Sequence, residues 1–262
     1  MAQARGSVTP ACCCVPADSP FVALMFCCAP KDPAKEFEKT DDAAQGFLPI
    51  DEAYVDTEKR IAICLKKELC LTASPEDYVI KKDDGTEWLK IVVDQDRRKI
   101  CKMDGTIECV LILATRNSEV NAVDASFALP HVYIYTLKPY KAEQVVSGFK
   151  EGDNDLYMWA RVSKTNKYSS KKLYDVAFAE SKGTKGGENL ELFGNGNAYK
   201  GVLDQDDRAS IRNCRRGMTV MVTEDADFSF ECQDCYKVKL KKQTDEIMMT
   251  AILECMEFLK DR

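Results

Sequence analysis

The chain has 262 residues, a length that suits one large domain or two small ones. Its formal net charge of −6 argues against general nucleic-acid binding, which calls for a basic footprint. The sequence shows no signal peptide ahead of its 13 cysteines, so we expect an intracellular protein with mostly reduced thiols. The single histidine, His131, argues against Ser/His/Asp catalysis and His-rich metal sites. We therefore expect no enzyme activity, no cofactor and no bound metal.

Residues 1–50 differ in composition from the rest of the chain. They combine clustered cysteines and several prolines with a charged run from Lys31 to Asp42, and they contain few β-branched residues. This composition favours a poorly ordered arm that could hold one short helix. No long Pro/Gly/Ser linker divides the remainder, so we expect one folded domain over residues 51–262.

Short apolar segments separated by turn residues fill most of the chain after residue 59. Two connections, Asp83-Asp84-Gly85-Thr86 and Met103-Asp104-Gly105-Thr106, are Asp-Gly turns of the kind that joins tight β-hairpins. This pattern predicts roughly a dozen short strands in an antiparallel meander. The expected strands are 60–66, 78–82, 88–93, 99–102, 107–113, 131–137, 156–162, 173–178, 190–193, 198–202, 219–222, 227–232 and 236–240.

The last apolar segment, residues 244–259, is predicted to be a helix with Thr244 as its N-cap. From Ile247 to Leu259 ten of thirteen residues are apolar, and such a helix is normally buried on most sides. It is shorter than the about 20 apolar residues that a membrane span needs. A large barrel has an interior to fill. We therefore predict a mainly β fold: a closed antiparallel β-barrel of about twelve strands around a central hydrophobic C-terminal helix.

Three polar residues interrupt this helix. Thr250, Glu254 and Glu257 lie four and three positions apart, so they share one narrow stripe. Inside a barrel, the carboxylates of this stripe should reach a barrel mouth, a gap in the wall or internal basic partners.

The strand and hairpin order resembles that of a known family. Residues 78–91 and 99–112 look like the two successive hairpins of the LURP-one-related proteins. Residues 236–241 followed by the helix resemble the strand-to-helix close of that family, with Asp245 at the position of its Asp. The resemblance covers about residues 59–260. The chain departs from the pattern at Lys241-Lys242-Gln243, where relatives often carry Pro-Gly, and in polar inserts at 141–155 and 181–189.

The LURP-one-related family is similar to the tubby C-terminal domain and to the phospholipid scramblases. The resemblance implies a twelve-stranded barrel around a central hydrophobic helix. The functions implied differ within this group. Tubby proteins bind phosphoinositides at the membrane, scramblases are acylated membrane proteins, and the plant relatives are linked to defence signalling. Fold alone does not decide among these roles.

Clustered cysteines in the arm are candidates for S-acylation. They lie beside apolar residues such as Phe21 and Phe26, and stable anchoring to a membrane requires more than one acyl chain. Scramblases carry a similar Cys/Pro-rich segment before the barrel. The alternative is an arm in which the cysteines are incidental. The candidates are Cys12, Cys13, Cys14, Cys27 and Cys28.

Basic residues in the last third of the chain are candidates for binding anionic lipid headgroups. A basic side chain near an anionic membrane contributes about 1 kcal/mol. The alternative for each cluster is an ordinary solvated surface. The candidates are Lys237, Lys239 and Lys241, which alternate along one strand, and Arg208, Arg212, Arg215 and Arg216. Earlier in the chain, Arg97, Arg98 and Lys99 form a further basic cluster that is a candidate for the same role.

Three further motifs are predicted to be structural. Cys232-Gln233-Asp234-Cys235 lacks the second ligand pair of a zinc site. Gly194-Asn195-Gly196-Asn197 lacks the helix that follows a phosphate loop. Asp204-Gln205-Asp206-Asp207 lacks the Gly and the final Glu of an EF-hand loop.

Together these observations predict a non-enzymatic, monomeric tubby-like barrel in the cytoplasm, peripheral to a membrane. It would bind phospholipid or phosphoinositide headgroups and be tethered by the acylated arm. A protein-interaction or signalling module without a lipid ligand is the alternative, and a scramblase-like activity is the third possibility.

Overall fold

Antiparallel strands and one apolar helix make up most of the part of the chain that the structure describes. The computed structural model describes residues 32–39, 49–50, 52–55, 62–66, 77–82, 84–114, 130–140, 149–165, 171–179, 198–225 and 235–260. All of them belong to one compact unit, Asp32–Arg262. Its helical elements are α1 (Pro33–Lys39), the short 3-10 helix η1 (Glu52–Tyr54) and α2 (Glu246–Leu259).

The described residues hold thirteen strands. They are β1 (Ala62–Lys66), β2 (Tyr78–Lys82), β3 (Glu87–Asp94), β4 (Arg97–Lys102), β5 (Ile107–Ala114), β6 (His131–Thr136), β7 (Phe149–Glu151), β8 (Asn154–Lys164), β9 (Lys172–Phe178), β10 (Tyr199–Leu203), β11 (Ala209–Asn213), β12 (Met218–Asp225) and β13 (Cys235–Leu240).

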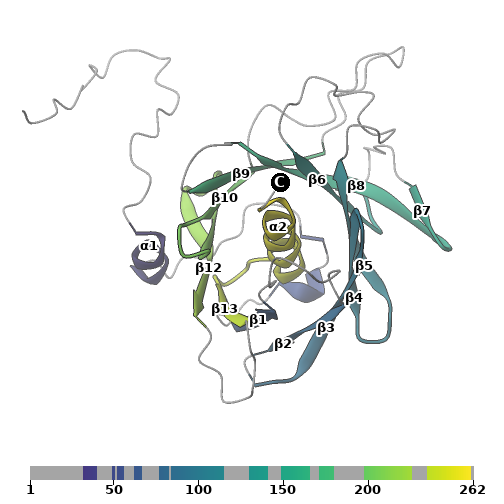
Figure 1. Cartoon of the computed structure of the whole chain (residues 1–262), viewed down its shortest axis with the longest axis horizontal. Helices are drawn as coiled ribbons and strands as arrows, with labels where there is room; N and C mark the ends of the chain where they lie inside the picture. Colours follow the sequence, from purple (N-terminus) through teal and green to yellow (C-terminus); the bar gives the residue numbers. More distant parts are fainter. Residues whose placement is uncertain are drawn as a thin grey trace, which may run out of the picture. The chain divides into compact units, whose positions relative to one another are not determined.

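The strands form one antiparallel sheet that curves around α2 (Figure 1). Its order is β6-β5-β4-β3-β2-β1-β13-β12-β11-β10-β9-β8-β7. β6 also pairs with β8, from His131 opposite Ser163 to Thr136 opposite Tyr157. β7 pairs only with the first residues of β8, which leaves twelve strands around the helix. The expectation of a mainly β, antiparallel fold with a C-terminal helix is confirmed.

Both predicted hairpins are present. β2 and β3 are joined through Gly85 with φ +82°, and β4 and β5 through Gly105 with φ +90°. This left-handed conformation is the one that glycine adopts without steric cost. In each turn the preceding aspartate, Asp84 or Asp104, accepts the backbone N–H two residues later at 2.8 Å. The local Asp-Gly-Thr sequence therefore fixes the register of these strands.

Two strands, β7 and β11, were not predicted. β7 lies within residues 141–155, which we expected to be a polar insert. β11 contributes only Ala209 and Ile211 as buried apolar residues, which is too weak a pattern to mark a strand. The expected strands at 190–193 and 227–232 lie outside the described residues.

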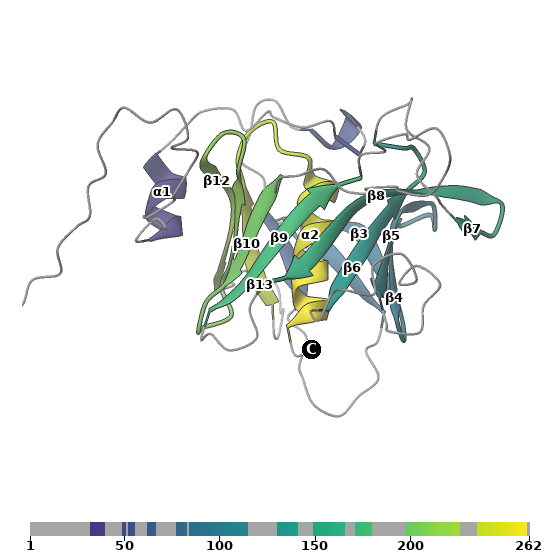
Figure 2. The ribbon, with the colours of Figure 1, turned by 90° about the horizontal axis from the view of Figure 1, so that it is seen from above.

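The core lies between α2 and the inner face of the sheet. Thirteen of the fourteen residues of α2 are buried, which agrees with the prediction of an enclosed helix. Figure 2 shows α2 running between β9 and β10 on one side and β3 and β5 on the other. Gly201 of β10 allows close approach, because a Cβ there would lie 2.5 Å from the Met256 sulfur.

The N-cap of α2 differs from the predicted one. Asp245, not Thr244, is the N-cap, and its Oδ1 accepts the Met248 N–H at 2.9 Å. Its other carboxylate oxygen accepts the backbone N–H of Ile50, and Val55 forms a β-bridge with Asp245. A carboxylate has two acceptor oxygens and a charge that the helix dipole favours. Asp245 can therefore cap α2 and bind the Ile50 backbone at the same time.

The polar stripe of α2 meets a basic partner inside the sheet. Arg98 of β4, one of the basic candidates, does not lie at the surface: it points inward, and its Nη1 lies 2.8 Å from Glu254 Oε2. The Arg98 guanidinium also lies 4.5 Å from the centre of the Phe258 ring. Glu254 therefore has an internal basic partner, one of the three environments expected for the carboxylates of this stripe.

Candidate functional site

The helix α1 begins with a local sequence signal inside residues 1–50. Asp32 Oδ1 accepts the backbone N–H groups of Ala34 at 3.2 Å and Lys35 at 3.4 Å, as an N-cap does. Pro33 follows at the first helical position, where its missing N–H is no loss. The hydrogen bond from the Lys35 backbone lowers the pKa of Asp32 below its usual value. The sequence therefore starts a helix at this position.

This short helix packs against the outer side of the sheet beside β12 (Figure 1). Its anchor is Phe37, which is fully buried. Lys241, which follows β13, points its Nζ over the Phe37 ring at 4.7 Å from the centroid. The same Nζ donates a hydrogen bond to the Phe37 carbonyl oxygen at 2.5 Å. Lys241 is itself 3% exposed, so the aromatic ring and the ammonium group are buried together.

The Glu36 carboxylate is bound by two strands at once. Arg212 Nη1 of β11 lies 2.8 Å from each of its oxygens, and the Thr219 hydroxyl of β12 donates to Oε2 at 2.7 Å. Arg212 and Thr219 are direct partners in the β11–β12 ladder. A register shift between Ile211 and Arg212 precedes this pair, and such bulges re-aim the following side chain. A second Arg212 nitrogen donates to the Gly217 carbonyl, which holds the guanidinium in place.

Glu38 extends the contact to β13. Its carboxylate lies 3.7 Å from Lys239 Nζ, which also pairs with Glu224 of β12 at 2.8 Å. We call Arg212, Thr219, Lys239 and Lys241 the α1 face. Arg212, Thr219 and Lys239 come from three adjacent strands, and Lys241 directly follows β13. Together they meet two carboxylates, an aromatic ring and a backbone carbonyl of one helix.

The structure brings together some of the predicted basic residues and separates others. Arg212, Lys239 and Lys241 meet at the α1 face. Arg208 is exposed just before β11, whereas Arg215 and Arg216 are exposed in the turn just after it. The five residues of β11 place these ends about 17 Å apart, at about 3.4 Å per residue. Lys237 lies on β13 opposite Glu224.

The acidic and aromatic side of the site was not predicted. Sequence reasoning allowed a short helix in the arm but assigned no role to Glu36, Phe37 or Glu38. The Asp32-Pro33 pair is a helix-start signal that would have placed it. Nothing in the sequence indicates that Phe37 packs on Lys241, because this contact joins residues 204 positions apart.

A second polar cluster lies where η1 meets the sheet. The Tyr54 hydroxyl donates to Glu108 Oε1 at 2.9 Å, and Lys102 pairs with the same oxygen at 3.0 Å. Burial and the neighbouring Glu108 raise the pKa of Tyr54 to about 12, so the phenol stays neutral and remains a donor. The Trp88 and Tyr54 rings pack in a T-shaped arrangement with their centroids 6.1 Å apart. Each of these groups has a partner, and the cluster attaches η1 to the sheet.

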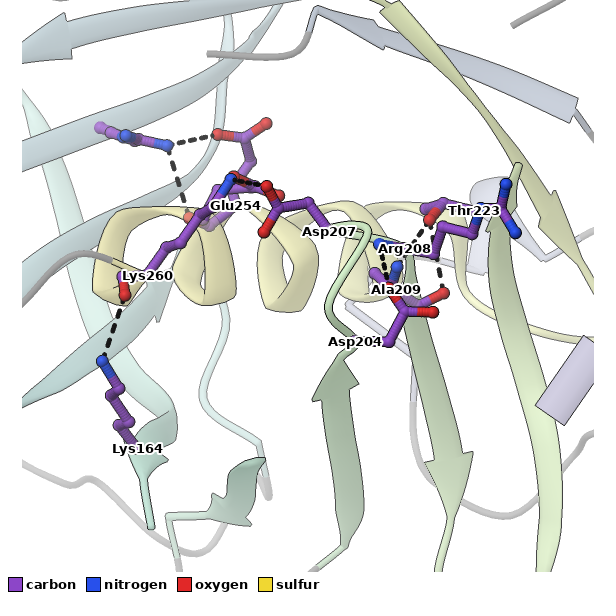
Figure 3. Close-up of polar contacts among 10 residues, drawn as sticks. Lys164, Asp204, Asp207, Arg208, Ala209, Thr223, Glu254 and Lys260 are labelled. Carbon is purple, nitrogen blue, oxygen red and sulfur yellow. Dashed lines mark hydrogen bonds and ion pairs between the residues drawn. The ribbon is translucent and has the colours of Figure 1, made fainter. Parts of the chain in front are cut away.

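Polar contacts also hold the C-terminal end of α2, and their role is structural too. Lys164 Nζ donates to the Lys260 carbonyl at 3.1 Å (Figure 3) and to the Leu259 carbonyl at 3.3 Å, at a helix end that favours a cation. Lys260 Nζ pairs with Asp207 at 2.8 Å. In the Asp204–Asp207 motif, Asp204 Oδ1 accepts the backbone N–H groups of Asp206 and Arg208. Its carboxylate therefore stabilises a turn.

The thiols and the histidine show no reactive arrangement within the described part of the chain. The five arm cysteines proposed for acylation lie outside it, as does Cys232. Burial raises the pKa of both Cys109 and Cys255, which are free and enclosed in the core. His131 Nε2 lies 3.1 Å from the Tyr133 hydroxyl. Over the described ranges, no group of three His, Cys, Asp or Glu side chains could hold a metal ion.

No helix in the described ranges combines the length and apolar character needed to cross a membrane.

Comparison with known proteins gives one distant structural similarity. No family model and no curated protein sequence matches the chain. A protein of Arabidopsis thaliana solved by X-ray crystallography matches with a TM-score of 0.49 and 12% sequence identity. The match covers 82% of this chain and 98% of that one. This is a distant similarity of fold, and the resemblance to the LURP-one-related family stays a prediction.

Proposed function

We propose that the protein is a non-enzymatic binding module that recognises an acidic segment of a partner protein through the α1 face. The observation that carries this proposal is the way the face holds α1. Arg212 and Thr219 bind a carboxylate, while Lys241 binds both an aromatic ring and a backbone carbonyl. A backbone carbonyl and an aromatic ring are parts of a peptide rather than of a lipid headgroup. The binding of a short helix by its anchor residues is a common mode of peptide recognition.

The fold provides a rigid support for such a face. We propose that the twelve strands form a closed barrel of the tubby C-terminal-like, LURP-one-related type. Six residue pairs between β6 and β8 support closure, since they join the two ends of the strand order. Binding residues held on strands keep their geometry better than residues on loops.

The proposal can be tested with a variant whose own helix cannot occupy the face. In the full-length double variant Glu36→Ala, Phe37→Ala, which we call the opened chain, the α1 face itself is unchanged. A fluorescein-labelled peptide of residues 31–42 serves as the probe, and fluorescence anisotropy measures its binding. We expect saturable binding to the opened chain, and Arg212→Ala added to that chain should weaken it at least tenfold.

The matched control is Arg215→Ala, which removes an exposed arginine in the turn after β11. It should leave the affinity of the opened chain within a factor of two. If the opened chain remains folded by circular dichroism and does not bind the peptide, or if both arginine variants weaken binding equally, the proposal is wrong.

The second candidate function is binding to anionic lipid headgroups, with S-acylation of the arm as a tether at a cytoplasmic membrane surface. It is favoured by the geometry at Arg212, whose guanidinium holds a carboxylate through both oxygens, as it could hold a phosphate. Vesicles with and without phosphoinositide provide the test. Binding that requires phosphoinositide and is lost when Arg212 and Lys239 are changed to Glu would favour lipid. Release of acyl chains by hydroxylamine would identify the tether.

A further inference from the structure

The acidic and aromatic residues of α1 are consecutive, and this order determines how they meet the sheet. In an α-helix successive side chains are about 100° apart, so Glu36 and Glu38 flank Phe37 on either side. Phe37 packs against Lys241, Glu36 reaches the β11–β12 pair, and Glu38 faces β13. The α1 face therefore matches an acidic–aromatic–acidic triplet presented by a short helix.

We propose that this triplet is the recognition element of the partner, and that α1 is the chain's own copy of it, which competes for the face. The inference rests on the proposed function, because it names the kind of partner that the same surface takes. It adds that the free protein is closed and that a partner must displace α1.

The contacts of α1 are of a kind that allows displacement. A helix of seven residues is too short to be stable alone, so its structure depends on docking. Its ion pairs are partly solvated, with Glu36 and Arg212 about one quarter exposed and Glu38 54% exposed. The Glu38–Lys239 pair, at 3.7 Å and with Glu38 more than half exposed, contributes little on its own. An element held by one anchor and solvated pairs belongs to the least stable part of a fold.

Release of α1 also does not leave the charge of Lys241 shut off from water. Lys241 is buried beneath α1, and its ammonium group contacts Phe37. When α1 leaves, solvent can reach this ammonium group, so the large penalty of an unpaired buried charge is avoided. The core beneath is unaffected, because Val238 and Leu240 of β13 point inward to α2.

The internal copy reduces the apparent affinity for a partner. A segment joined by a short connection competes at an effective concentration of about 1 mM. If the same segment supplied in trans binds with a Kd of about 0.1 mM, the closed chain should bind it about tenfold more weakly than the opened chain.

The experiment compares the labelled peptide of residues 31–42 on the wild-type and opened chains by anisotropy. We expect about tenfold weaker binding to the wild-type chain. The control variant Lys35→Ala changes an α1 side chain that points into solvent, and it should behave as the wild type does. Peptides with Phe37→Ala or with both Glu36→Gln and Glu38→Gln should each lose at least tenfold in affinity for the opened chain.

Hydrogen exchange over residues 33–39 of the wild-type chain supplies an independent readout. Saturating peptide should increase this exchange, because displaced α1 loses its structure. Equal affinity for the wild-type and opened chains, or unchanged exchange when the peptide is bound, would refute the claim that α1 competes for the face, and it would leave the proposed binding function standing. Equal binding of the three peptides would refute the claim that the triplet is the recognition element. Failure of every peptide to bind the folded opened chain would remove the proposed function as well.

Discussion

The buried pair between Arg98 and Glu254 gives the sharpest test of how α2 is held in the sheet. Both side chains are almost fully buried, at 4% and 3% exposure, and their charged atoms lie 2.8 Å apart. Glu254→Ala would leave the Arg98 guanidinium buried without its carboxylate. Loss of one partner of a buried ion pair costs about 3–5 kcal/mol. For a domain of this size, each 1 kcal/mol lowers Tm by about 2–4 °C.

We therefore expect Glu254→Ala to lower Tm by roughly 6–20 °C. The double variant Arg98→Met, Glu254→Leu should be much closer to wild type, because apolar residues of similar size remove both charges together. The single variant Arg98→Met should recover stability as the pH falls, since Glu254 can then take up a proton instead of staying charged. Urea denaturation followed by tryptophan fluorescence, to which buried Trp159 of β8 contributes, measures these differences.

Two outcomes would refute this reasoning. One is a destabilisation by Glu254→Ala of less than about 1 kcal/mol, below the range for a broken buried pair. The other is a double variant as unstable as the sum of the single variants, which would mean that the two charges do not interact.

Three further predictions concern other parts of the fold. Gly201→Ala should destabilise the protein by about 1–3 kcal/mol in urea denaturation, because its Cβ would overlap the Met256 sulfur. Combined with Met256→Ala, it should destabilise by less than the sum of the two single variants, because the overlap is then removed. The lowered pKa of Asp32 means that its cap on α1 is present above the usual Asp pKa and is lost as pH falls through the folded value. The protection of residues 33–39 against hydrogen exchange, measured relative to the intrinsic exchange rate at each pH, should therefore fall in acid. Asp32→Asn, which also caps helices, should retain protection and lose this pH dependence. Maleimide labelling read by mass spectrometry should modify partly exposed Cys214 before Cys255, because Cys255 is enclosed in the core and burial raises its thiol pKa further than that of Cys214.

Sequence reasoning located the elements that are specified by residues close together in the sequence. The Asp-Gly turns specify positive φ at Gly85 and Gly105, and the apolar pattern of residues 247–259 specifies an enclosed helix. A basic partner for Glu254 could be expected from the sequence, since a charge inside a core needs one. The sequence could not show that this partner is Arg98, because that depends on which face of β4 turns inward.

Elements that depend on tertiary contacts could not be predicted from the sequence. β11 has too few apolar residues to stand out, and it pairs because β10 and β12 lie on either side. Lys241 continued the alternation of Lys237 and Lys239, so it was expected on a solvated face. It is buried because Phe37 covers it. The grouping of Arg212 with Lys239 and Lys241 likewise follows from strand order.

Two long-range contacts, those of Glu254 and Phe37, differ in a way that separates stability from binding. Glu254 lies inside the sheet and meets Arg98 where water is excluded, so its loss should weaken the whole fold. Phe37 lies on the outside and holds only α1, so its loss should free the face and leave the core packed. Phe37→Ala should therefore strengthen binding of the 31–42 peptide with little change in the urea midpoint. Glu254→Ala in the opened chain should instead lower the urea midpoint. The Kd of the folded protein for the peptide should stay constant. A parallel loss of stability and affinity in both variants would show that α1 is part of the cooperative core rather than a ligand of its surface.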